Sequence, residues 1–298
     1  MNSRISKTGT YAGIWAAMFG AFVALTVSAQ QSAEVPNPHA DVLSIGGSVT
    51  EIVAALGQQH RLRARDTTSS YPPDVTHLPD VGYMRSLSPE GVLSVGPSLI
   101  LSEEGAGPPE ALEVIRAADV GFVEVPDALS TEGILRKIEI IGTALGVPEQ
   151  ADGLATEVEA AMAAALTDAK RPEAKKKRVL FVLSTQGGKI NASGAGTAAD
   201  ALIRMAGGVN AITDYEGYKQ VTDEAVGMAA PDVILMMDRG GDHGVADDEL
   251  FAMPAIKLTP AAQSRSVVRM DGLLMLGFGP RTAQAIRELN DALYGQGS

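Results

Sequence analysis

Apolar residues along this chain follow two alternating patterns, short continuous runs and longer stretches with a helical period. The continuous runs, typical of strands buried on both faces, lie at 42–45, 98–101, 121–125, 179–183, 232–237 and 266–270. The helical stretches lie between or after these runs, at 49–56, 88–95, 108–118, 130–145 and 280–294. Strands that alternate with helices predict parallel α/β sheets.

One segment in the middle departs from this alternation. Residues 148–170 are rich in Ala and Glu, and their apolar residues recur at helical spacing. This pattern predicts one long helix, which ends at a basic run that contains Pro172. We therefore expect two Rossmann-like α/β lobes, 30–147 and 173–298, joined by a linking helix over 148–172.

The two expected lobes share a spacing signal. Glu90 lies seven residues before Pro97, which opens a buried strand, and Glu224 lies seven residues before Pro231, which opens another. Two such units with equal spacing, one in each lobe, indicate a duplicated architecture with a ligand cleft between the halves.

Two helix starts carry a capping pattern. Ser48 is followed three residues later by Glu51, and Thr197 is followed by Asp200, which is the spacing of a capping box. Helix starts that follow strands face the cleft in such folds, where their free N–H groups can hold an anion. Plain capping, without a ligand, is the simpler explanation of each box taken alone.

The N-terminus has the order of a secretory signal. Arg4 and Lys7 precede an apolar stretch over 12–27, and small residues end at Ala29. We expect cleavage near Ala29 and a periplasmic protein. The alternative is an uncleaved anchor, because the stretch is only slightly shorter than a span of about 20 residues.

Composition and charge narrow the function. The net charge of −12 argues against nucleic-acid binding, because the mean field repels phosphates. The chain has no Cys, so disulfides, thiolate sites and acylated cysteines are excluded. The four His do not pair at metal-ligand spacing. The motifs G-x-S-x-G, H-E-x-x-H, G-x-x-x-x-G-K-S/T and G-x-G-x-x-G after a strand do not occur. The acidic pairs 103–104 and 247–248 are interpreted as solvated surface. These observations favour a binding protein over an enzyme.

The loop over 80–90 holds the most specific chemistry. Tyr83 follows Gly82, and Arg85 stands two residues further on. A phenolate is a good ligand for ferric iron, and haem can be held by Tyr. A nearby cation such as Arg85 favours the phenolate. Packing against other residues is the alternative role for such a tyrosine.

Three segments carry a resemblance to a known family. They are SIGGSVTEI at 44–52, LPDVGYMRSLSPEG at 78–91, and TAADA at 197–201 with AGGVN at 206–210. On these residues the mature chain resembles the periplasmic haem-binding proteins of bacterial ABC haem importers. Their class of substrate-binding proteins, built on a helical backbone, also includes cobalamin and ferric-siderophore binders.

The resemblance implies a function and roles for residues. The protein would capture haem and deliver it to an inner-membrane ABC transporter, with only peripheral contact to the membrane complex. Tyr83 would be the axial iron ligand and Arg85 its support. Glu90 and Glu224, one per lobe, would dock on arginines of the permease subunits.

The sequence departs from some members of this class in one respect. Where those members supply a second axial histidine, the loop 184–188 has none, and His243 lies in a different loop. We therefore expect five-coordinate, tyrosine-ligated haem. Met84 is a candidate for apolar contact with the macrocycle, and Arg281 for a propionate. A siderophore or corrinoid ligand, or a secreted enzyme that acts on a ligand in the cleft, are the alternatives.

Overall fold

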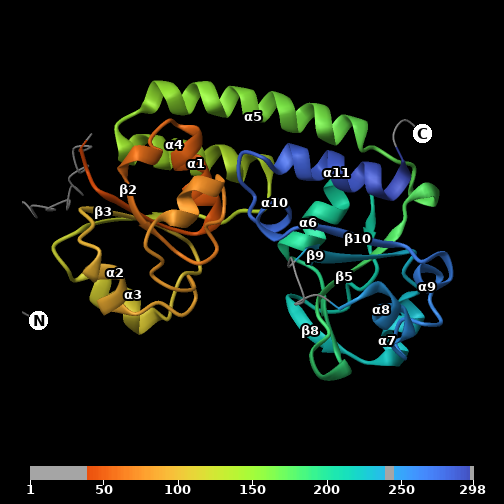
Figure 1. Ribbon diagram of the computed structural model, residues 1–298. Helices are drawn as coiled ribbons and strands as arrows, with labels where there is room; N and C mark the ends of the chain where they lie inside the picture. The colour runs from red at the N-terminus through yellow and green to blue at the C-terminus, as the bar shows by residue number, and fades with distance from the viewer. Residues whose placement is uncertain (1–38, 239–244, 296–298) are drawn as a thin grey trace, which may run out of the picture. The chain divides into compact units, whose positions relative to one another are not determined.

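The computed structural model describes residues 39–238 and 245–295. The N-terminal lobe follows the expected alternation (Figure 1). Its elements are β1 (Val42–Ile45), α1 (Gly47–Ala55), β2 (Leu62–Arg65), α2 (Pro89–Ser94), β3 (Leu99–Glu103), α3 (Pro109–Arg116), β4 (Gly121–Val125) and α4 (Thr131–Leu145), with short 3-10 turns at Gln59–Arg61 and Pro73–His77. The four strands form one sheet in the order β2-β1-β3-β4, and every pairing is parallel.

The long central helix is present as expected. It is α5 (Pro148–Asp168), and Pro148 stands in its first turn, where a missing N–H costs nothing. The helix packs on α4 of the N-terminal lobe and on α11 of the C-terminal lobe. Its buried face, which includes Val158 and Met162, belongs to an apolar cluster that continues into both lobes. The linking helix is therefore anchored to both lobes by packing.

The C-terminal lobe is built on a mixed sheet. Its elements are β5 (Arg178–Ser184), β6 (Ile190–Ser193), α6 (Ala198–Met205), β7 (Val209–Asn210), β8 (Tyr218–Val221), α7 (Asp223–Ala229), β9 (Val233–Asp238), α8 (Asp247–Ala252), α9 (Pro260–Ser264), β10 (Val267–Asp271), α10 (Gly272–Leu276) and α11 (Thr282–Tyr294), with 3-10 turns at Glu173–Lys175 and Gln186–Gly188. The strand order is β10-β9-β5-β6-β8, and β7 pairs with β5.

The expectation of parallel sheets holds only in part for this lobe. The pairings of β10 with β9, β9 with β5 and β7 with β5 are parallel. Strand β6 pairs antiparallel with β5 and with β8. These two strands are short and carry several polar residues, so they lack the continuous apolar run of a buried strand.

The two expected capping boxes have different outcomes. Thr197 caps α6 and accepts a hydrogen bond from the N–H of Asp200, as predicted. The box at Ser48 is wrong, because Gly46 is the N-cap of α1 and Ser48 already lies inside the helix. Gly46 has a φ of +106°, which a residue with a side chain adopts only under strain.

The described residues contain no helix that is both long and apolar enough to cross a membrane. The predicted signal segment, residues 1–29, lies outside the described residues.

Candidate functional site

The loop that carries Tyr83 is fixed by Asp80. Its carboxylate pairs with Arg65 at 3.1 Å and accepts hydrogen bonds from the Thr67 hydroxyl (3.1 Å) and the N–H of Gly82 (2.8 Å). The N–H of Thr67 also donates to the carbonyl of Gly82. Gly82 has a φ of +99°, the conformation for which glycine is suited. Both the N–H and the carbonyl of Gly82, the residue before Tyr83, are therefore hydrogen-bonded.

Tyr83 begins a tight turn at the tip of this loop. The N–H of Ser86 donates to the carbonyl of Tyr83 at 2.8 Å. Tyr83 is 45% exposed, and Arg85 is also exposed. The turn thus presents a phenol and, two residues further on, a guanidinium, on a backbone that hydrogen bonds restrain. The loop position expected for Tyr83 is therefore present, and its role as an iron ligand stays a prediction.

Met84 faces the other way from its two neighbours. It is 7% exposed and belongs to an apolar cluster with residues such as Leu43 and Ile100. Its carbonyl accepts the N–H of Gly107. Met84 therefore anchors the turn to the lobe, and we leave it out of the proposed ligand contacts.

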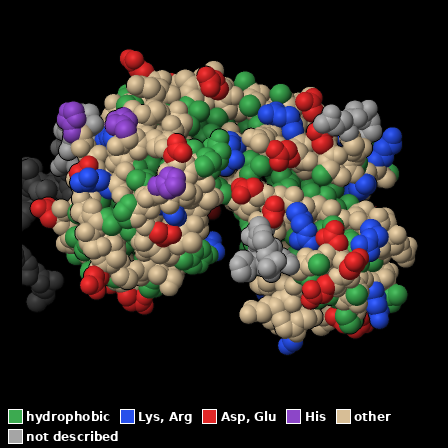
Figure 2. Space-filling model, viewed as in Figure 1, with side chains coloured by type: hydrophobic (Ala, Val, Ile, Leu, Met, Phe, Trp, Pro, Cys, Tyr) green, Lys and Arg blue, Asp and Glu red, His purple; other side chains and the backbone are tan. Residues whose placement is uncertain are grey.

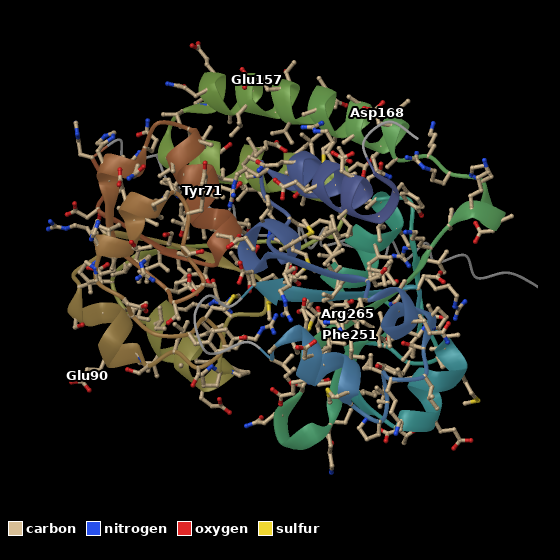
Figure 3. All side chains as sticks on the ribbon, turned by 45° about the vertical axis from the view of Figure 1, so that its right-hand side comes forward. Tyr71, Glu90, Glu157, Asp168, Phe251 and Arg265 are labelled. Carbon is tan, nitrogen blue, oxygen red and sulfur yellow. The ribbon has the colours of Figure 1, made fainter. Side chains whose placement is uncertain are left out.

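Arg281 is occupied by another partner. Its guanidinium pairs with Glu51 of α1 at 2.9 Å, and its backbone N–H donates to the same carboxylate at 3.1 Å. The guanidinium also lies 3.5 Å from the ring centroid of Tyr71. Figure 3 shows Tyr71 beside α1. The cation predicted for a propionate joins the two lobes instead, so we leave Arg281 out of the ligand contacts as well.

The two acidic residues predicted to dock on the permease occupy equivalent helix positions. Glu90 is the second residue of α2 and Glu224 the second residue of α7, and both are exposed. Figure 3 shows Glu90 projecting outward from the end of its lobe. Acidic residues in a first helical turn interact favourably with the helix dipole, so neither needs a protein partner to be stable.

A buried charged network lies behind the start of α1. The Lys137 side chain of α4 is 0% exposed, and its Nζ lies 2.6 Å from Glu103 and 2.7 Å from Asp127. The Ser48 hydroxyl contacts both Lys137 and Glu103. Burial alone would lower the pKa of Lys137, but the two carboxylates outweigh it and raise that pKa. The expectation of a solvated Glu103 is wrong, because this network encloses it.

Sequence reasoning missed one residue near the Tyr83 loop. Tyr218, the first residue of β8, is 36% exposed. Burial raises the pKa of its phenol, while hydrogen bonds from Thr197 and Ala199 and the positive charge of Arg85 oppose that rise. Arg85 belongs to the other lobe, so Tyr218 and the Tyr83 loop lie within electrostatic reach of each other. An exposed Tyr shortly before a capped helix, as in the N-terminal lobe, was the available signal.

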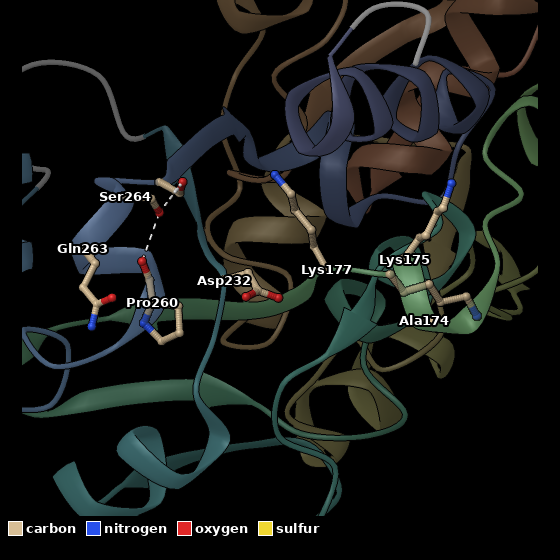
Figure 4. Close-up of a pocket in the computed structure, with 9 residues that line it drawn as sticks. Ala174, Lys175, Lys177, Asp232, Pro260, Gln263 and Ser264 are labelled. Carbon is tan, nitrogen blue, oxygen red and sulfur yellow. Dashed lines mark hydrogen bonds between the residues drawn. The ribbon is translucent and has the colours of Figure 1, made fainter.

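A pocket and the described histidines lie apart from this region. A shallow pocket lined by Lys175, Lys177 and Asp232 lies at the amino ends of the C-terminal strands, the edge opposite to their carboxyl ends (Figure 4). Within 39–238 and 245–295, no group of three or more His, Cys, Asp or Glu is placed to hold a metal ion. In Figure 2 the histidines of the N-terminal lobe stand apart from one another. His243 lies outside the described residues.

Comparisons with known proteins agree on the family. Residues 42–273 match the model of the periplasmic binding protein family. The chain belongs to this family. A solved structure, the periplasmic haem-binding protein BhuT in complex with two haems, is 38% identical, covers 85% of this chain and 97% of its own, and superimposes with a TM-score of 0.81.

Curated relatives extend the comparison. An uncharacterised ABC transporter substrate-binding lipoprotein, YvrC of Bacillus subtilis, is 26% identical over 91% of this chain and 85% of its own length. A vitamin B12-binding protein of Pectobacterium carotovorum is 26% identical over 77% of this chain and 83% of its own length. The protein is thus a substrate-binding protein of an ABC transporter with the two-lobed fold of haem binders. The family and these neighbours are binding proteins of transport systems.

Proposed function

We propose that this protein captures ferric haem after secretion, with its signal cleaved near Ala29, and delivers it to the permease without chemical turnover. The observation that carries the proposal is the exposed Tyr83 on a restrained turn with Arg85 two residues on. Phenolate oxygen is a hard ligand that suits oxidised iron, and a guanidinium nearby favours the charged form of a phenol. The 38% identity to BhuT over 97% of its chain supports the same ligand.

In this proposal Tyr83 is the axial protein ligand of the iron. Arg85 supports the phenolate and offers a cation to a propionate. The macrocycle would cover the exposed face of the Tyr83 turn, and burial of its apolar surface adds to the iron–oxygen bond. The haem iron would be five-coordinate, because the loop over 184–188 contains no histidine that could supply a second axial ligand.

A corrinoid is the second candidate ligand, because relatives that match most of this chain are vitamin B12-binding proteins. The two candidates are separated by titration of the purified protein with haemin and with cyanocobalamin, followed by absorption spectroscopy. We expect a Soret shift on tight, saturable binding of haemin and no saturable binding of cyanocobalamin at the same concentrations. Tight binding of cyanocobalamin without binding of haemin contradicts the proposal.

Glu90 and Glu224 are proposed as the docking contacts with the permease. Replacement by Glu90→Lys or Glu224→Lys should leave haem affinity unchanged within about twofold, while transporter-dependent haem uptake into proteoliposomes falls about tenfold. Exposed charges at a rim act mainly on the association rate and on orientation. The defect should also depend on ionic strength, because salt screens exposed charges.

The matched control for docking is Glu110→Lys. Glu110 is also an exposed acid at the second position of its helix, α3. Glu110→Lys therefore changes the net charge and the interaction with the helix dipole in the same way as Glu90→Lys and Glu224→Lys. Glu110 is not one of the two proposed docking residues. An equal loss of uptake with Glu110→Lys shows that total charge, and not docking at two points, controls delivery.

A further inference from the structure

The N-terminal lobe places its proposed iron ligand just before a capped acidic helix. The exposed Tyr83 stands five residues before Ser88, whose hydroxyl caps α2 by accepting the N–H of Gly91 at 2.9 Å. Glu90 follows as the second residue of that helix. One short segment therefore carries both the group that faces the ligand and the group proposed to face the permease.

The C-terminal lobe repeats this arrangement. The exposed Tyr218 stands four residues before Thr222, whose hydroxyl caps α7 by accepting the N–H of Ala225 at 3.1 Å. Glu224 follows as the second residue of α7. The order of exposed tyrosine, hydroxyl cap and acidic second residue is thus the same in both lobes, although the preceding backbone is a loop in one and strand β8 in the other.

Tyr218 is held in a defined orientation. It pairs across the strands with Ser193 of β6. Its ring meets Phe181 edge-to-face, with the centroids 6.2 Å apart and the planes at 63°. The edge-to-face contact and the strand pairing restrict this ring, while 36% of the residue stays exposed.

We propose that Tyr218 is a further ligand-contact residue, supplied by the C-terminal lobe, whose ring packs against the macrocycle while Tyr83 binds the iron. This inference rests on the proposed haem function. A flat, fixed aromatic surface suits a flat macrocycle, since it buries apolar area at low cost in side-chain entropy. The repeated segment then gives each lobe one tyrosine for the ligand and one glutamate for docking.

The assignment as a packing contact, and not as a second iron ligand, follows from the hydroxyl. Burial raises the pKa of the Tyr218 phenol, which keeps the phenol protonated at neutral pH. A neutral phenol is a much weaker ligand for ferric iron than a phenolate.

The test compares haemin with metal-free protoporphyrin IX, measured by absorption and fluorescence titration of the full mature protein. Tyr218→Ala should weaken both ligands equally, about tenfold. Tyr218→Phe, which keeps the ring, should stay within about twofold of wild type and leave the ferric spectrum unchanged. Tyr218→Leu keeps the contact with Phe181 without a flat ring and should resemble Tyr218→Ala, which covers the case that Tyr218→Ala does not fold.

The control is Leu258→Ala. Leu258 is 78% exposed in the same lobe, just before α9, and its removal should not alter either affinity. If Tyr218→Ala and Tyr218→Leu bind both ligands as wild type does, the contact is disproved while the haem function stands. If Tyr218→Phe alters the iron bands, Tyr218 is an iron ligand and the packing assignment is overturned. Failure of the wild-type protein to bind haemin overturns the proposed function itself.

Discussion

Replacement of Tyr83 by Phe should lower the affinity for ferric haem at least about 100-fold, which corresponds to about 2.7 kcal/mol. The substitution removes only the phenol oxygen, so the apolar contacts with the macrocycle remain and binding is weakened without being abolished. The ferric spectrum should lose the charge-transfer band of an iron–phenolate bond. Affinity for metal-free protoporphyrin IX should stay within about twofold of wild type, because the lost bond is to the metal.

Two variants control for this result. Tyr71→Phe removes one hydroxyl from another exposed tyrosine of the same lobe and should leave haem binding unchanged. His243→Ala should leave the ferric spectrum unchanged if Tyr83 is the one axial protein ligand. An unaltered affinity and spectrum in Tyr83→Phe refutes the ligand assignment, and low-spin features that vanish in His243→Ala refute five-coordination.

The second large effect is expected at Lys137. Lys137→Met should destabilise the fold by about 3 kcal/mol, because it leaves the buried Glu103 without its cation. For a protein of this size that loss lowers the melting temperature by roughly 6–12 °C. Thermal unfolding followed by circular dichroism measures it. Lys189→Met, at an exposed lysine, should change the melting temperature little.

The loss in Lys137→Met should depend on pH. Without the cation, burial holds the pKa of Glu103 in the folded state above its ordinary value of 4.5. A group whose pKa is raised on folding contributes stability that is present below the unfolded pKa and is lost as pH rises through the folded pKa. The variant should therefore be destabilised less at pH 5 than at pH 8.

The double variant separates charge from packing. In Lys137→Met with Glu103→Gln, no charge remains buried at this position, so part of the stability should return and the pH dependence should flatten. The network also supports the start of α1, because Ser48 bonds to both charged groups. If Lys137→Met loses equal stability at pH 5 and pH 8, the shape of the lysine matters and its charge does not.

The sequence by itself determined the local elements and one half of the proposed site. Strands and helices can be predicted from the spacing of apolar residues within a short stretch of chain, because that spacing shows which face of the element is buried. The linking helix, the alternation of the N-terminal lobe and the hydroxyl cap of α6 follow from such local rules. The Tyr83 loop was also predictable, because the glycine, the phenol and the guanidinium lie within the four residues 82–85.

Only the tertiary structure decided which distant groups meet. Glu103 and Lys137 are 34 residues apart, and Arg281 and Glu51 are 230 apart. Each side chain alone has the pattern of an exposed polar residue, and only the packing of strands and helices brings opposite charges together. The same reason explains why Tyr218 was missed. Its neighbours Phe181, Thr197 and Arg85 come from three separate segments. No pattern in the sequence around Tyr218 predicts that these segments meet there.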